Sequence, residues 1–191
     1  STLNPQTRRN GGMHYTSIEN IHKVIDPLFL DELKEEFTQI KSIKKSRKLK
    51  LEEFQNKLAS LTFLDPACGS GNFLTETYLS LRRLENEVLK ELLQTEGKGS
   101  TLAGLITDIH QYNLIKVSIS QFYGIEINDF AVNVAKTALW IAENQMMKET
   151  ENIIHMDLDF LPLKTNAYIV EGNALRMNWQ DIIAKEKLNY I

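Results

Sequence analysis

Residues that could bind a ligand occur where three apolar runs of the sequence end. The run "LTFLD" leads into "PACGSG", in which Gly69 and Gly71 precede a helical pattern that begins at Asn72. Glycines at such a turn let the backbone approach a ligand, and the first turn of a helix presents free N–H groups to it. A nicotinamide dinucleotide site would have a third glycine at position 74, where this chain has leucine, and no Gly-Lys-Ser/Thr of a P-loop follows. The turn predicts a ligand site without the full phosphate-binding motif, and a plain strand-to-helix turn is an equal alternative.

The second and third apolar runs end in residues that suit a nucleoside. "YGIEI" carries Glu126 at its tip, where a carboxylate beside the glycine turn can accept hydrogen bonds from two ribose hydroxyls. "AYIVEGNAL" places Asn173 at a strand-to-turn junction, where its amide can bind the edge of a purine. The alternatives are an exposed surface glutamate and an ordinary Gly-Asn turn.

Strands that alternate with helices position these residues from residue 61 onwards. Helical spacing predicts helices over 72–93 and 128–147, the second with Ala135 and Ile141 among its inward residues. "WQDIIAKE" predicts a short helix, and "LNYI" the start of a fourth strand. The stretch 109–121 alternates like a strand without excluding a helix. The alternation predicts an α/β domain over residues 61–191 with a doubly wound, mostly parallel sheet.

Residues 1–60 predict a helical extension before this domain. Thr16 with Glu19 fits a capping box for a first helix, and Asp26-Pro27 fits the start of a second helix with Leu30, Leu33, Phe37 and Ile40 on one face. A third helix is predicted from about Leu49 to Ala59.

Composition excludes several classes of protein. The 191 residues carry a net charge of −3, and the single cysteine rules out an internal disulfide framework and suits a reducing cytoplasm. No apolar run approaches the roughly 20 residues of a membrane helix, and four scattered histidines without a Cys-x-x-Cys motif predict no metal site. The chain begins without methionine and ends on an apolar run, so we expect a piece of a longer protein.

Four stretches of the sequence resemble, in order, motifs of DNA adenine-N6 methyltransferases of type I and fused type II restriction–modification enzymes. "DPACGSGNFL" resembles their S-adenosylmethionine-binding motif, "GIEIND" their second motif and "GNAL" their third. "GGMHYTSIENIHKVIDPLFLDEL" resembles the upstream motif that closes over the methionine end of the cofactor. The resemblance covers about residues 11–191. It implies a Rossmann-like class I methyltransferase sheet, cut after the start of its fourth strand, in a cytoplasmic enzyme that acts on double-stranded DNA.

The resemblance also implies which residues bind S-adenosylmethionine. For the methionine part of the cofactor, the family pattern assigns Tyr15 and Thr16 to the carboxylate and Asp65 to the amino group. The backbone of Ala67, Cys68, Gly69 and Gly71 is assigned to the methionine and ribose, and Phe73 to packing near the cofactor. For the nucleoside, the pattern assigns Glu126 to the ribose hydroxyls, Ile127 to one face of the adenine and Asn173 to its edge. The thiol of Cys68 is interpreted as a small packed group rather than a nucleophile.

No residue of this chain is predicted to be catalytic. The family's Asn/Asp-Pro-Pro-aromatic tetrapeptide, which receives the flipped adenine, is expected after the fourth strand and therefore beyond Ile191. A specificity or nuclease domain in the same protein is also compatible with the resemblance. A methyltransferase for RNA or protein, and a non-catalytic nucleotide-binding module, are the alternative functions. The sequence assigns no role to the segment 95–121, and it favours a solvated linker for the basic cluster at residues 41–50.

Overall fold

Three parallel strands form the sheet of this protein. The structure, a computed structural model, describes residues 16–95, 114–155 and 166–191. Within these ranges β1 (Phe63–Asp65), β2 (Phe122–Glu126) and β3 (Tyr168–Glu171) lie in the order β1-β2-β3. Tyr190 adds a parallel bridge to Phe63. The predicted fourth strand therefore begins on the edge of β1 that does not pair with β2, so the strand order reverses at β1. The predicted α/β fold with a parallel sheet is confirmed.

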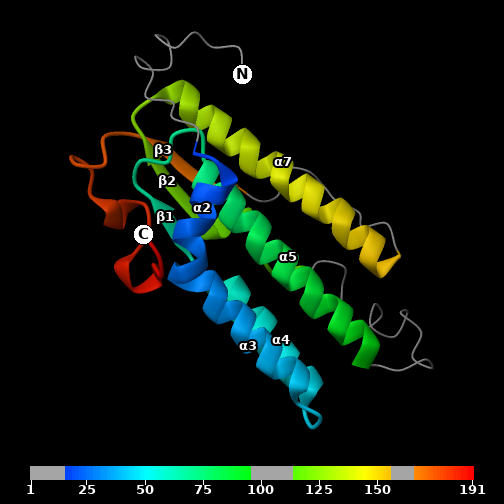
Figure 1. Cartoon of the computed structure of the whole chain (residues 1–191). Helices are drawn as coiled ribbons and strands as arrows, with labels where there is room; N and C mark the ends of the chain where they lie inside the picture. Colours follow the sequence, from blue (N-terminus) through cyan, green and yellow to red (C-terminus); the bar gives the residue numbers. More distant parts are fainter. Residues whose placement is uncertain (1–15, 96–113, 156–165) are drawn as a thin grey trace.

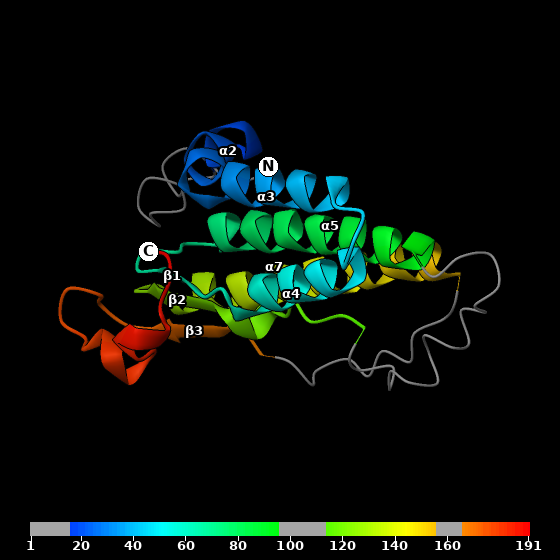
Figure 2. The same cartoon turned by 90° about the horizontal axis from the view of Figure 1, so that it is seen from below.

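Helices cover one face of this sheet. They are α2 (Ile18–Ile25), α3 (Asp31–Ser42), α4 (Arg47–Ser60), α5 (Asn72–Thr95) and α7 (Asp129–Ile154), with the short turns η1 (Asp26–Leu30) and η3 (Ile119–Gln121). The C-terminal segment after β3 forms two further short turns, η4 (Trp179–Asp181) and η5 (Lys185–Lys187). Figure 1 shows α5 and α7 running side by side, and Figure 2 shows the helices stacked on one side of the strands. Among the described helices, none has the length and apolar character needed to cross a membrane.

Alternate residues of the strands build two apolar clusters. Phe63 and Phe122 stack with ring centroids 5.3 Å apart and join the large cluster under the helices. Leu64 and Ile125 point to the opposite face, where Ile183 from the C-terminal segment packs on them. Both faces of the sheet are therefore covered, as expected for parallel strands.

The first helix begins one residue later than predicted. Ser17, not Thr16, is the N-cap of α2, and its Oγ accepts a hydrogen bond from the backbone N–H of Asn20 at 3.4 Å. The expected capping box of Thr16 and Glu19 is therefore wrong, because the cap has moved to the neighbouring hydroxyl.

The predicted helix start at Asp26-Pro27 is also wrong. The chain continues from α2 into α3 through the π-helical turn η1, in which the N–H of Asp31 donates to the carbonyl of Asp26. A wider turn accommodates the missing N–H of Pro27 without ending the helix. The inward face predicted for this region is confirmed, since Leu30, Leu33, Phe37 and Ile40 are all buried.

Three predictions further along the chain need correction or limits. Ile141 of α7 was expected inside and is 49% exposed, whereas Leu139 is buried. "WQDIIAKE" forms no α-helix but the separate short turns η4 and η5. In the ambiguous stretch, 114–118 is irregular and η3 follows, while 109–113 lies outside the described residues.

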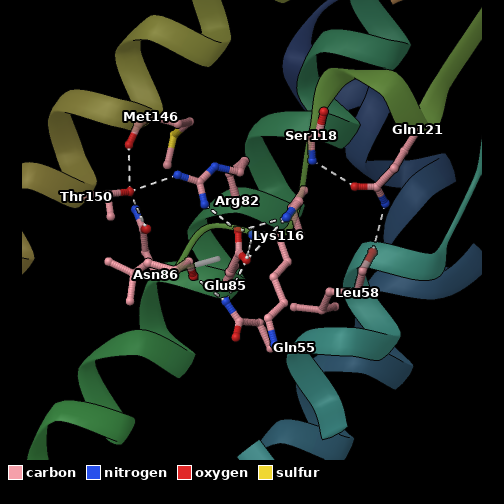
Figure 3. Close-up of polar contacts among 12 residues, drawn as sticks. Gln55, Leu58, Arg82, Glu85, Asn86, Lys116, Ser118, Gln121, Met146 and Thr150 are labelled. Carbon is pink, nitrogen blue, oxygen red and sulfur yellow. Dashed lines mark hydrogen bonds and ion pairs between the residues drawn. The ribbon is translucent and has the colours of Figure 1, made fainter. Parts of the chain in front are cut away.

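A buried polar cluster ties the helices to the segment that enters β2. The carboxylate of Glu85 accepts hydrogen bonds from Arg82, from Gln55 Nε2 at 2.8 Å and from the N–H of Lys116 at 2.7 Å (Figure 3). Arg82 in turn donates to Thr150 Oγ1 of α7 at 2.8 Å. The Arg82 and Glu85 side chains are both fully buried. One carboxylate therefore joins α4, α5 and the entry to β2, the strand that carries Glu126.

Candidate functional site

The glycine turn between β1 and α5 forms the centre of the site. The side chain of Asp65, at the end of β1, accepts a hydrogen bond from the N–H of Ala67 at 3.0 Å and so shapes the start of the turn. Gly69 and Gly71 have φ angles of +54° and +78°, which L side chains rarely adopt. The turn therefore favours glycine at both positions on conformational grounds.

The two glycines differ in what surrounds them. A Cβ at Gly69 would meet no protein atom within 4 Å, so this position faces open space. A Cβ at Gly71 would lie 2.9 Å from Cβ and 3.1 Å from Cα of Ala135 on α7. Gly69 is thus the position where a ligand can approach the backbone, whereas Gly71 lets α7 pack against the turn.

Glu126 connects the glycine turn to the neighbouring loop. Its Oε2 accepts a hydrogen bond from the N–H of Gly69 at 2.9 Å, and its Oε1 accepts one from the N–H of Asn128 at 3.0 Å. Burial and the nearby Glu126 raise the pKa of Asp65, while the hydrogen bond from Ala67 opposes the shift. Two carboxylates therefore lie near each other at the carboxyl ends of adjacent strands.

Cys68 is held inside the turn and has no nucleophilic character. Its backbone N–H donates to the carbonyl of Ile125 at 3.1 Å, and a Cβ at Gly124 would lie 2.8 Å from its sulfur. Burial raises the pKa of the thiol to about 12, with further contributions from Asp65 and Glu126. The thiol is therefore protonated at neutral pH. Because the thiolate is the nucleophilic form, the Cys68 thiol is not a nucleophile there.

The third loop lies directly beside Glu126. The N–H of Gly172 donates to the carbonyl of Glu126 at 2.8 Å, which brings Asn173 next to the second loop. The side-chain oxygen of Asn173 accepts a hydrogen bond from the N–H of Leu175 at 3.0 Å. On the second loop, Ile127 is 68% exposed. Three loops at the carboxyl ends of β1, β2 and β3 therefore meet at one edge of the sheet.

A cavity of about 240 Å³ lies beside β1, next to the C-terminal residues Tyr190 and Ile191. Its lining comes from α2 and η1, from the end of β1, from the first turns of α5 and from Tyr190 and Ile191. Of the sequence-predicted residues, Asp65 and Phe73 line this cavity. Asp65 thus belongs both to the glycine turn and to the cavity wall.

The structure gathers most of the predicted residues but not all of them. Tyr15 lies outside the described residues, and Thr16 is half-buried directly before the cap of α2. In the parts of the chain that the structure describes, no group of three His, Cys, Asp or Glu residues could hold a metal ion.

Sequence reasoning missed two further features of the site. The first is Phe130 in the first turn of α7, which is 61% exposed and lies three residues after Ile127. The sequence signal that could have indicated it is an apolar residue at an otherwise polar helix start. His22 of α2 contacts Glu76 of α5, and no sequence signal marked this pair.

Comparison with known proteins identifies relatives along nearly the whole chain. A family model described as "MmeI, DNA-methyltransferase domain" matches residues 40–191. DNA methyltransferase A of Bacillus subtilis (strain 168) is 43% identical over 179 residues, which cover 93% of this chain and 18% of that protein. A putative type II restriction enzyme and methyltransferase of Methanocaldococcus jannaschii is 36% identical over 92 residues, 48% of this chain and 7% of that protein.

A solved structure also matches the fold. The Type IIL restriction-modification enzyme MmeI in complex with DNA superposes with a TM-score of 0.82 at 42% identity, covering 97% of this chain and 23% of that one. The chain therefore spans less than a quarter of the length of each of these relatives.

Proposed function

Because the chain belongs to the family of the MmeI DNA-methyltransferase domain, we propose that it is the cofactor-binding part of a DNA methyltransferase. The enzyme would transfer a methyl group from S-adenosylmethionine to adenine N6 in a restriction–modification system. The observation that carries this proposal is the contact of Gly69 with Glu126, which joins the glycine turn to a carboxylate at the tip of the adjacent strand. We place the protein in the cytoplasm, where DNA is found and where reducing conditions suit a single free cysteine.

S-adenosylmethionine fits the residues around Gly69 in space and in charge. The space beside Gly69 is open, so a ligand can lie against the backbone there. Each oxygen of Glu126 accepts one backbone hydrogen bond and has capacity for another, which ribose hydroxyls could use. Asp65 and Glu126 form an acidic pair that a positively charged ligand would stabilise, and this cofactor carries an ammonium and a sulfonium group. When bound, it supplies an electrophilic methyl group.

The remaining residues would orient the cofactor. Ile127 would cover one face of the adenine, and Asn173 has its amide nitrogen left for the adenine edge, since its oxygen accepts from Leu175. Phe73 would contact the cofactor from the cavity beside Asp65. For Tyr15 and Thr16 we keep the proposed role at the methionine carboxylate. In this proposal, residues 61–191 bind the cofactor and residues 1–60 close over it.

We assign no residue of this chain to methyl transfer itself. No Asn/Asp-Pro-Pro-aromatic tetrapeptide occurs in the sequence. We propose that the longer protein supplies this tetrapeptide, the contacts to double-stranded DNA and a specificity or nuclease domain. Binding of the cofactor and chemistry on the base would then be separable.

Transfer of a tritiated methyl group to unmethylated DNA tests the proposed function. We expect no transfer by the 191-residue chain, and adenine methylation by a chain extended to the length of its restriction–modification relatives. Transfer by the short chain alone would show that the chemistry lies within it. An extended chain that methylates RNA or protein but not DNA would replace the proposed substrate.

A further inference from the structure

His22 connects two helices that form separate walls of the cavity beside Asp65. Its Nδ1 lies 2.8 Å from Oδ1 of Asp26, and its Nε2 lies 3.2 Å from Oε1 of Glu76 on α5. The Glu76 side chain is 7% exposed, and Arg83 of α5 donates to the same Oε1 at 3.2 Å. The imidazole therefore bridges the helical extension and the helix that begins at the glycine turn.

The positions of these residues relate the bridge to the cavity. One wall comes from α2 and η1 through Val24, Ile25, Leu28 and Phe29, and another from α5 through Phe73, Leu74 and Thr77. His22 precedes the first set in the chain, and Glu76 lies within the second. A change in the contact between His22 and Glu76 would therefore move one wall relative to the other.

We propose that His22 is a positioning residue of the cofactor site, whose protonated imidazole holds α2 against α5 and so fixes the cavity beside Asp65. The proposal rests on the S-adenosylmethionine site proposed above. Only a protonated imidazole donates from both ring nitrogens, as contacts with two carboxylates require. After deprotonation, one of Asp26 and Glu76 faces a nitrogen lone pair, and the bridge weakens.

The charges around His22 favour the protonated form. Two carboxylates contact its ring, Asp26 from η1 and Glu76 from α5. Four further charged residues line a second cavity of about 600 Å³ together with His22, namely Arg83 and Glu87 from α5 and Lys34 and Lys41 from α3. The hydrogen bond with Asp26 is the largest cause that raises the pKa of His22; desolvation opposes it, and Glu76 adds to it. Because the folded-state pKa is raised, the stabilisation is fully present below the ordinary value of 6.5 and is lost as pH rises through the raised value.

Apolar contacts retain α2 when the bridge is lost. Ile21 and Ile25 are 2% and 3% exposed and belong to the main core cluster. We therefore expect His22→Gln to fold, with α2 attached but held less tightly.

Amide hydrogen exchange of α2 and calorimetric titration with S-adenosylmethionine test the proposal on the whole chain, from about pH 5.5 to about pH 8.5, where histidines titrate. In the native chain, two quantities should each fall about five- to tenfold as pH rises: the affinity for S-adenosylmethionine and the protection of the α2 amides, corrected for the intrinsic exchange rate. This range is at the lower end for a hydrogen bond to a charged group, because His22 is partly exposed. His22→Gln should show the reduced values at every pH. Glu76→Gln tests the contact from the other side and should lower the pKa of His22 measured by NMR.

A matched control is His155→Asn. His155 caps the far end of α7 with a φ angle of +54°, a conformation that asparagine tolerates, so this variant should keep the native pH dependence. The proposal is overturned if protection of α2 does not change with pH, or if His22→Gln and Glu76→Gln both behave like the native chain. If S-adenosylmethionine fails to bind at any pH, the proposed function fails, and the exchange data alone decide whether His22 holds α2.

Discussion

The backbone N–H of Gly69 donates a 2.9 Å hydrogen bond to the carboxylate of Glu126, across a sequence separation of 57 residues. The second oxygen of Glu126 accepts from the N–H of Asn128 at 3.0 Å. One side chain therefore fixes the loops after β1 and β2 relative to each other. A site arranged in this way needs little ordering when a ligand binds, and this favours affinity.

The two glycines of the turn should respond differently to substitution. Gly71→Ala is expected to lower the free energy of unfolding by about 2–4 kcal/mol, because its Cβ meets Ala135 in a left-handed conformation. Gly69→Ala should cost only about 1 kcal/mol, since no protein atom is near, yet it should weaken S-adenosylmethionine binding strongly. Urea unfolding and calorimetry measure the two effects. Equal losses of stability in both variants would contradict the different surroundings of the two glycines.

Cys68 should be unreactive in the folded protein. The raised thiol pKa of about 12 predicts slow reaction with a disulfide reagent near pH 8 and rapid reaction in urea, and the chain's single cysteine makes the signal unambiguous. Because the unfolded thiol ionises near its ordinary value of 9.0 and the folded one does not, stability should fall as pH rises above that value. Fast labelling under native conditions would mean that Cys68 is exposed and ionised.

The buried pair of Arg82 and Glu85 should be costly to break. Glu85→Gln is expected to lower the free energy of unfolding by about 3–5 kcal/mol, because it removes the carboxylate that pairs with the fully buried Arg82. Glu87→Gln is a matched control on the same helix, since Glu87 forms an exposed pair with Lys90 at the same spacing. The control should cost no more than about 0.5 kcal/mol. Similar losses in both variants, measured by urea unfolding, would argue against the importance of the cluster in Figure 3.

Local signals predicted the parts of the fold that position the site. Apolar runs located β1, β2 and β3, and helical spacing located α5 and the start of α7, whereas α7 continues to Ile154, beyond the predicted end at residue 147. Polar residues at the tips of parallel strands were expected to meet, and Gly69 and Glu126 do so in the structure. The strands and helices depend on short-range patterns, and the contact of the two residues follows from the parallel order of adjacent strands, so both could be predicted from the sequence.

Features set by tertiary packing could not be predicted in this way. Burial of Phe29 and Leu30 accompanies a continuous helix through Pro27, although the Asp-Pro pair is a typical helix start. The inward face of α7 depends on how it packs against both α5 and the sheet, and this packing exposes Ile141. The contact of His22 with Glu76 joins residues that are 54 positions apart, and neither the sequence around His22 nor that around Glu76 indicates it.

Calorimetric titration of the native chain and of Glu126→Ala with S-adenosylmethionine tests the central claim most directly. Loss of charge-assisted hydrogen bonds worth roughly 1.5–3 kcal/mol should weaken binding about ten- to a hundredfold. Glu149→Gln, on an exposed part of α7, should bind like the native chain, and circular dichroism should show all three proteins folded. An unchanged dissociation constant for Glu126→Ala would contradict the assignment of Glu126, and no binding by the folded native chain would contradict the proposed cofactor site.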